Sequence, residues 1–261
     1  MEEKYLPVGF YDSGVGGLSV LSATRALLPN EDYIYFGDNA NAPYGSKDEE
    51  LIKKLSLKCG DFLHSQNVKM IVIACNTATS IVVKTMRENY RIPIISMEPA
   101  VKPATEQTSR KVVVMATPAT LRQKRYKALL KRLAIEDRVV DLDCGKLAGM
   151  VEREAPESDL ALYVNEKLKG VESRKPVGAV VLGCTHYSFI SGIISKEAKK
   201  VFGGECEIFD GMYGTARHVK NVLQQENLLN DAPNKGSVRF FTSDKNTGPD
   251  KLRHFYNKFQ K

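Results

Sequence analysis

The sequence of 261 residues lacks the features that mark several classes of protein. No run approaches the ~18 apolar residues that a membrane-spanning helix needs, and the first residues contain neither a basic leader nor an apolar signal-peptide region. No basic stretch is interleaved with aromatic residues, as is typical of chains that stack nucleic-acid bases. We therefore expect a soluble, cytoplasmic protein that binds neither membranes nor nucleic acid.

Cysteine is scarce, and its spacing argues against two common uses. The five cysteines are an odd number, and no two of them form a C-x-x-C pair. This pattern disfavours both a disulfide framework and a tetrahedral zinc site. The cysteines are Cys59, Cys75, Cys144, Cys184 and Cys206. We expect reduced thiols and no bound metal.

The formal net charge of +7 is compatible with an anionic partner. However, Lys and Arg are spread along the chain. The two densest clusters, Arg122–Arg125 and Lys196–Lys200, fall on predicted helices with apolar residues at helical spacing. Solvated helix faces explain these clusters better than a nucleic-acid site does.

Short apolar runs rich in β-branched residues alternate with longer amphipathic segments. This alternation predicts an α/β fold with doubly wound, mainly parallel sheets covered by helices on both faces. The predicted strands are Val8–Tyr11, Tyr33–Phe36, Met70–Ala74, Pro93–Ser96, Lys111–Ala116, Val139–Leu142, Val177–Leu182, Glu207–Phe209 and Val238–Thr242. In such sheets functional groups gather at the carboxyl ends of the strands.

Two predicted helices carry local start signals. Ser46, with Glu49 three residues later, predicts a capping box, and Thr117 followed by Pro118 predicts a second helix start. Five apolar side chains should share one face of the first of these helices, because they recur at helical spacing. They are Leu51, Leu55, Cys59, Phe62 and Leu63.

The two halves of the chain are related in pattern. An offset of 109 residues aligns Ile71–Cys75 with Val180–Cys184, and an offset of 104 aligns residues 8–13 with residues 112–117. In each half one strand ends in a hydroxyl residue and a later strand ends in cysteine, which indicates a duplicated α/β unit. We expect two pseudo-symmetric domains, the first formed by residues 1–97 with 210–261 and the second by residues 98–209.

Two loop segments follow the first predicted strands. The turn DSGVGG at 12–17 is not G-x-G-x-x-G and lacks the Lys of a P-loop, so a nucleotide site is poorly supported. It is consistent with a tight turn, or with a pocket for a small carboxylate lined by Asp12 and Ser13. The segment NAPYGSK at 41–47 either presents Tyr44 near the strand ends or forms an ordinary surface turn.

Cys75 and Cys184 each close an apolar strand. Taken alone, each is compatible with a small buried hydrophobe. However, Cys75 precedes a predicted helix start, which favours a thiolate, and Cys184 has a candidate base, His186, two residues away. A cysteine protease would leave the second cysteine without a role. Two thiols from matching halves fit inversion of a carbon acid, in which one group removes the α-proton and the other protonates the opposite face.

Five segments together resemble the glutamate racemases of the cofactor-independent aspartate/glutamate racemase superfamily. They run from Phe10 to Tyr187 and read FYDSGVGGLSVL, APYGSK, ACNTATS, EPAVKPA and LGCTHY, with weaker similarity in DGMYGTA at 210–216. The resemblance implies two α/β domains with the active site in the cleft between them. It also implies interconversion of L- and D-glutamate without a cofactor, a supply of D-glutamate for peptidoglycan, and a homodimer.

The same resemblance implies roles for individual residues. Cys75 would abstract the α-proton of D-glutamate and Cys184 that of L-glutamate. Asp12 and His186 would assist the neighbouring thiols, and Glu152 would lie near the histidine. The implied substrate-binding positions are Asp12, Ser13, Tyr44, Gly45, Asn76, Thr77, Thr185 and His186. An imidazolium at His186 would stabilise a thiolate, whereas an anionic Asp12 would disfavour one, so Asp12 fits a proton acceptor or a partner of the substrate ammonium.

The chain departs from the family pattern at Ser188, where Pro is common, and at Thr79 and Met97. These positions bear on packing more than on the expected acid and base. Three rival interpretations stay open: racemisation of aspartate or a related amino acid, binding of an anionic amino acid without catalysis, and a redox-sensing pair of thiols.

Overall fold

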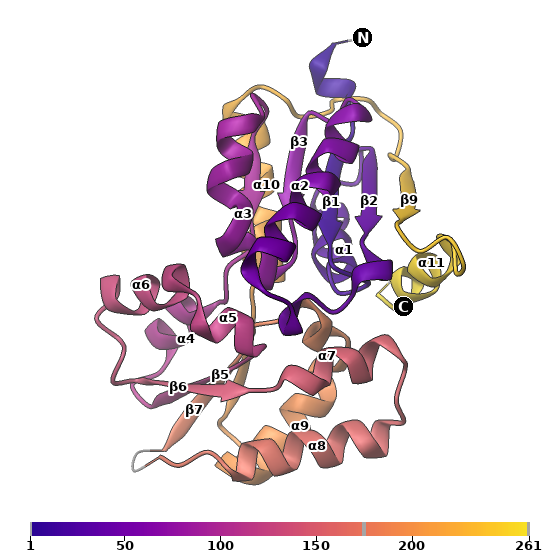
Figure 1. The fold of residues 1–261 in the computed structure, drawn as a ribbon. Helices are drawn as coiled ribbons and strands as arrows, with labels where there is room; N and C mark the ends of the chain where they lie inside the picture. Colours follow the sequence, from indigo (N-terminus) through magenta and orange to yellow (C-terminus); the bar gives the residue numbers. More distant parts are fainter. Residues whose placement is uncertain (1, 174–175, 260–261) are drawn as a thin grey trace. The chain divides into compact units, whose positions relative to one another are not determined.

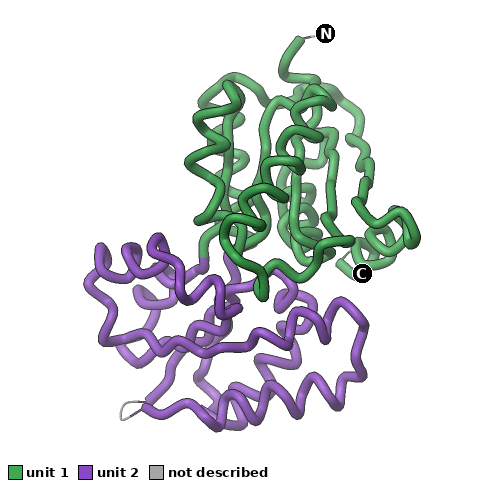
Figure 2. Tube along the Cα trace, viewed as in Figure 1, with its two compact units in different colours: residues 1–98, 212–261 green, residues 99–211 purple. Residues whose placement is uncertain are grey.

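A computed structural model describes residues 2–173 and 176–259 of the chain (Figure 1). The chain divides into two compact units, residues 1–98 with 212–261 and residues 99–211 (Figure 2). Each unit contains one parallel sheet with helices on both faces, which confirms the predicted fold class. All nine predicted strands are present, and each bound agrees to within one residue.

The first unit is built on a five-stranded sheet in the order β4-β3-β1-β2-β9, and all of its pairs are parallel. The strands are β1 (Val8–Asp12), β2 (Tyr33–Gly37), β3 (Met70–Ile73), β4 (Ile94–Ser96) and β9 (Val238–Thr242). Two helices lie side by side on one face, and three pack on the other (Figure 1). The former are α2 (Glu49–Ser65) and α3 (Asn76–Asn89), and the latter are α1 (Leu18–Leu27), α10 (Met212–Gln225) and α11 (Asp250–Lys258).

Successive residues of the central strands fill the two faces in turn. Tyr11, Ile71 and Ile73 pack with α2 and α3 in one apolar core. On the opposite face the rings of Phe10 and Tyr33 meet with their centroids 6.0 Å apart. Strands that are covered on both faces have nearly continuous apolar sequences, and for this reason the apolar runs of the sequence predicted their positions correctly.

The second unit contains a four-stranded parallel sheet in the order β6-β5-β7-β8. The strands are β5 (Lys111–Ala116), β6 (Val139–Asp143), β7 (Val177–Leu182) and β8 (Glu207–Asp210). The helices are α4 (Val101–Gln107), α5 (Pro118–Arg122), α6 (Lys124–Arg132), α7 (Gly145–Glu152), α8 (Glu157–Lys169) and α9 (Ser191–Phe202). α4 and α6 share one core with the sheet, and α8 and α9 pack against each other.

The two sheets share one connectivity. β1 pairs with β2 and β3, and β5 pairs in the same way with β6 and β7. The register partners Tyr11 and Ile73 of the first sheet correspond to Met115 and Leu182 of the second. These are the positions that the offsets of 104 and 109 residues relate. The hydrogen-bond registers therefore agree with the predicted duplication, to which the first unit adds β9.

The start of α2 differs from the prediction. Asp48, not Ser46, is the N-cap residue, and its Oδ1 accepts a hydrogen bond from the backbone N of Leu51 at 2.8 Å. Ser46 ends the short 3-10 helix η3 (Tyr44–Ser46), so the predicted capping box formed by Ser46 and Glu49 is wrong. Leu51 is 40% exposed, and the buried face of α2 is formed by Ile52, Ser56, Cys59, Gly60 and Leu63. The start at Thr117 is confirmed, because its side chain accepts from the backbone N of Thr120.

Replacement of Asp48 by Ala is expected to lower the free energy of unfolding by about 1 kcal/mol, because it removes an N-cap that also lies at the positive end of the helix dipole. Ser46→Ala is the matched comparison and should change stability by less than about 0.5 kcal/mol. Urea unfolding of both variants measures the difference. An equal or larger loss in Ser46→Ala would contradict the assignment of the cap.

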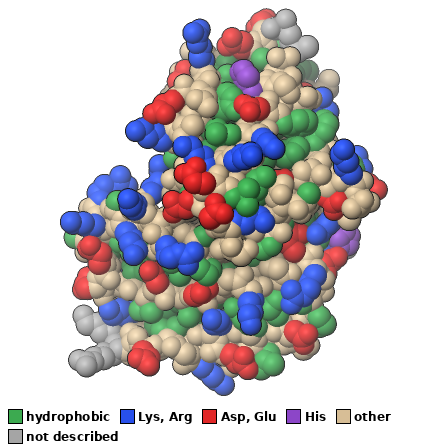
Figure 3. Space-filling view, in the orientation of Figure 1, with side chains coloured by type: hydrophobic (Ala, Val, Ile, Leu, Met, Phe, Trp, Pro, Cys, Tyr) green, Lys and Arg blue, Asp and Glu red, His purple; other side chains and the backbone are tan. Residues whose placement is uncertain are grey.

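The surface carries both signs of charge. On the face shown in Figure 3, Lys and Arg side chains are interspersed with Asp and Glu. Lys196, Lys199 and Lys200 are exposed on α9, as a solvated helix face requires. Within the described ranges, no helix combines the length and apolar character needed to cross a membrane.

Candidate active site

The carboxyl edge of the first sheet brings Asp12, Ser13 and Cys75 together. β1 and β3 are neighbours in register, so the residues that follow their last pair lie side by side. The Sγ of Cys75 is 3.7 Å from the Oγ of Ser13, and the thiol is 5% exposed. Cys75 is also the residue directly before α3, so the positive end of that helix dipole lies next to the thiol.

The glycine-rich turn after β1 is a close-packed junction. The backbone N of Gly14 donates to the fully buried carboxylate of Asp12 at 2.9 Å, and the hydroxyl of Tyr35 donates to the carbonyl of Gly14 at 2.8 Å. A Cβ at Gly17 would lie 2.7 Å from the Cβ atoms of both Asp12 and Ala74. The turn therefore holds the start of α1 against the strand ends. Glycine is needed at position 17 because Asp12 and Ala74 lie too close to its Cα for a side chain, and not because its backbone has a positive φ.

Asn76 and Thr77, the first residues of α3, are buried beside the thiol. The side chain of Asn76 is 5% exposed, and neither its Oδ1 nor its Nδ2 has a hydrogen-bond partner among the described residues. A buried amide without a partner costs free energy, so a polar ligand at this edge would relieve the cost. Asn76 therefore offers a buried amide at this edge that is open to a polar ligand.

Tyr44 is held at the same edge of the first unit by a residue that the sequence reasoning missed. Its hydroxyl donates to Oδ2 of Asp38 at 2.5 Å, and Asn41 donates to Oδ1 of the same carboxylate at 2.9 Å. Burial, with the charge of Asp38, raises the pKa of Tyr44, so its hydroxyl remains a donor. Asp38 directly follows β2. The rule that functional groups gather at the carboxyl ends of parallel strands would therefore have identified it, as it did the residues after β1 and β3. The neighbouring Gly45 is half-buried.

The second unit places Cys184, His186 and Glu152 in a chain of contacts. The Sγ of Cys184 is 3.7 Å from Nδ1 of His186, and Nε2 of His186 is 3.0 Å from Oε1 of Glu152. Cys184 follows β7, His186 lies in the 3-10 helix η4 (Thr185–Ile190), and Glu152 ends α7. The thiol is 8% exposed, and Thr185 is 2% exposed beside it.

The environment of His186 favours its cationic form. Burial lowers the pKa of the imidazole, but the contacts with Cys184 and Glu152 raise it by more, so the pKa lies well above its ordinary value. The imidazolium is anchored on one nitrogen by a carboxylate and presents the other nitrogen to the thiol. This arrangement places an acid–base group next to the sulfur of Cys184.

A second set of polar residues at the edge of this sheet was also missed. Thr117, Thr120 and Gln123 follow β5 and are at most 5% exposed. The 104-residue offset relates Thr117 to Ser13, so the duplication could have indicated Thr117 as a candidate site residue. Hydroxyl and amide groups gathered at a strand end can bind a carboxylate.

The remaining three thiols have surroundings of a different kind. Burial raises the pKa of Cys144 to about 12 and that of Cys206 to about 11. Burial likewise raises the pKa of Cys59. All five cysteines are buried, and none of them takes part in a disulfide in this structure. Among residues 2–173 and 176–259, no group of three or more His, Cys, Asp or Glu side chains is arranged to hold a metal ion.

Comparison with known proteins gives a consistent result. The family model for Asp/Glu/hydantoin racemases matches residues 18–219. A glutamate racemase of Clostridium novyi is 44% identical over 246 residues, which cover 93% of each chain. The crystal structure of a Bacillus anthracis glutamate racemase superposes with a TM-score of 0.85 at 29% identity, covering 98% of this chain and 94% of that one. The Francisella tularensis glutamate racemase, solved with D-glutamate, has a TM-score of 0.81 at 31% identity, with the same coverage.

Proposed function

The chain belongs to the Asp/Glu/hydantoin racemase family, and from this premise we propose that it is a glutamate racemase that interconverts L- and D-glutamate. The observation that carries the proposal is the placement of Cys75 and Cys184 at equivalent strand ends of two sheets with the same connectivity. Each thiol lies among buried polar groups suited to a charged substrate. The glutamate racemases named above match this chain along most of their length, and they support the same conclusion.

The proposed reaction moves two protons and needs no cofactor. A thiolate at Cys184 takes the α-proton of L-glutamate, and the electron pair of the broken C–H bond stays on the α-carbon, delocalised into the carboxylate. The thiol of Cys75 then gives its proton to the opposite face. The products are D-glutamate, a thiol at Cys184 and a thiolate at Cys75, and the reverse reaction restores the first state. Thiols suit both roles because their ordinary pKa of about 8.5 leaves both forms accessible.

Three other side chains would support the transfer. His186, held by Glu152, stabilises the thiolate at Cys184. Asp12, held by the backbone N of Gly14, accepts the substrate ammonium or a proton beside Cys75. The substrate carboxylates are bound by the hydroxyl, amide and backbone donors of the two strand edges. These donors belong to Ser13, Tyr44, Gly45, Asn76, Thr77 and Thr185.

The physiological setting belongs to the same proposal. D-Glutamate made by this enzyme would supply peptidoglycan synthesis. We place the activity in the cytoplasm, where the thiols that act as acid and base stay reduced. A homodimer is expected, and light scattering of the purified chain tests it.

Incubation with L-glutamate in D2O tests the proposed function directly. Every turnover should place deuterium on the α-carbon, because the proton that completes the inversion comes from a thiol in exchange with solvent. NMR follows deuteration, and chiral chromatography follows the appearance of D-glutamate. L-Aspartate in a parallel reaction tests the substrate, and glutamate should be turned over faster. Absence of α-deuteration in glutamate would overturn the proposal in favour of binding without catalysis.

A further inference from the structure

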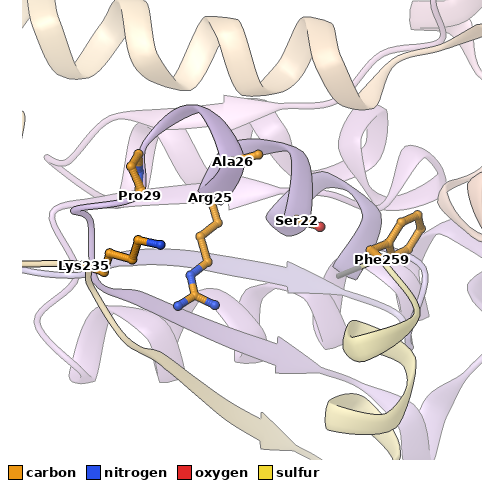
Figure 4. Close-up of a pocket in the computed structure, with 6 residues that line it drawn as sticks. All are labelled: Ser22, Arg25, Ala26, Pro29, Lys235 and Phe259. Atoms are coloured by element: carbon orange, nitrogen blue, oxygen red, sulfur yellow. The ribbon is translucent and has the colours of Figure 1, made fainter. Parts of the chain in front are cut away.

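A cavity in the first unit has a lining that the racemase reaction does not use. Its volume is about 390 Å³, and it is lined by Ser22, Arg25, Ala26, Pro29, Lys235 and Phe259 (Figure 4). None of these six residues is acidic, and two of them are cations. Small-molecule sites have volumes of roughly 300–1,000 Å³, so the cavity is large enough for a small organic ligand.

Three segments that are distant in the sequence form this cavity. Ser22, Arg25 and Ala26 belong to one face of α1, and Pro29 continues the same spacing. Lys235 precedes β9, and Phe259 follows α11. Figure 4 shows the side chains of Arg25 and Lys235 near each other at one end and the ring of Phe259 at the other.

The guanidinium of Arg25 is held in place by neutral groups. Nη1 donates to the hydroxyl of Tyr256 at 3.0 Å, and Nη2 donates to the carbonyl of Gly236 at 3.2 Å. A guanidinium has five N–H donors, so further donors are available for a ligand. Arg25 is half-buried, and within the described part of the chain no carboxylate pairs with it or with Lys235.

A half-buried cation without an anionic partner is costly, and a fixed guanidinium beside an ammonium suits a bound anion. We propose that this cavity binds a small organic anion, whose phosphate or carboxylate head contacts Arg25 and Lys235 and whose ring or apolar body lies against Phe259. The apolar wall distinguishes such a ligand from a simple inorganic ion.

The cationic end of this cavity lies away from the thiol of the first unit. α1 begins after the glycine-rich turn at the carboxyl edge of the sheet and ends at the opposite edge, where Pro29 accepts from the backbone N of Gly236. A helix of ten residues is about 15 Å long. A ligand in the cavity should therefore not compete with glutamate.

Titration calorimetry with phenyl phosphate, phenylacetate and inorganic phosphate tests the proposal on the full chain. Saturable binding is expected, with phenyl phosphate or phenylacetate binding more tightly than inorganic phosphate because of Phe259. The comparison between the first two identifies the preferred head group. Excess DL-glutamate should leave the affinity unchanged, so the result does not depend on the proposed racemase activity.

Variants locate the site. Arg25→Gln and Lys235→Gln should each weaken binding about tenfold, the usual effect of losing one charge-assisted hydrogen bond. Arg217→Gln removes an exposed charge from the same unit and should have no effect. Lys235 makes no hydrogen bond in the described structure, so its variant should fold normally even if Arg25→Gln does not. No saturable binding, displacement by glutamate, or unchanged binding in Lys235→Gln would each overturn the proposal.

Discussion

Cys75→Ala and Cys184→Ala are each expected to lower racemisation at least about 100-fold, while exchange of the α-proton survives on one enantiomer only. With Cys75 removed, Cys184 can still take the proton of L-glutamate, exchange it with solvent and return deuterium to the same face. With Cys184 removed, the same holds for D-glutamate. NMR of each pure enantiomer in D2O, with each of the two variants, measures exchange in all four combinations of variant and enantiomer.

Exchange is needed because steady-state rates cannot reveal which base serves which enantiomer. L- and D-Glutamate are enantiomers of equal free energy, so their equilibrium constant is one. The ratio of the two values of kcat/KM equals this constant, and it therefore stays at one in every variant. Loss of one base lowers both values together, whereas retained exchange reports a single face of the α-carbon.

Cys206→Ala is the matched control for this experiment. It removes a buried thiol of the second unit that lies away from the strand ends carrying the candidate site, and it should leave racemisation unchanged. Near-normal turnover in Cys75→Ala or Cys184→Ala would show that the bases are assigned to the wrong residues. Exchange of both enantiomers in one variant would show that a single group reaches both faces.

His186→Asn is expected to lower kcat about 100-fold, because Cys184 loses the cation that stabilises its thiolate. Glu152→Gln should cost about tenfold, since it removes one hydrogen bond to a charged group. It should also move the alkaline limb of the rate profile to lower pH. The contact with Glu152 raises the pKa of His186, so without it the imidazolium is lost at lower pH.

The pH dependence of kcat for Glu152→Gln, measured from L-glutamate, tests this reasoning. Glu157→Gln is the control, because it neutralises an exposed carboxylate at the start of α8, and its profile should match that of the unmodified chain. A tenfold loss without a shift of the alkaline limb would assign Glu152 a packing role. A shift to higher pH would contradict the proposed sign of the effect.

The local pattern of the sequence was sufficient to locate the strands and to place two of the cysteines at strand ends. Strands buried on both faces must be apolar along their whole length, so runs such as Met70–Ile73 and Val177–Leu182 stand out from the amphipathic helices between them. Parallel connectivity then places whatever follows each strand at one edge. The position of Cys75 and Cys184 at strand ends could therefore be predicted before any coordinates were known.

Contacts between distant segments were decided only by the tertiary structure. The family resemblance implied that Glu152 lies near His186, but the local pattern around either residue does not, because the two meet across 34 residues where α7 ends beside η4. Asp48 replaces Ser46 as the cap because Ser46 is already part of the turn that contains Tyr44. The sequence by itself determined the elements and the residues at their ends, since these depend on local pattern. The partners of those residues depend on packing between elements, and only the tertiary structure decided them.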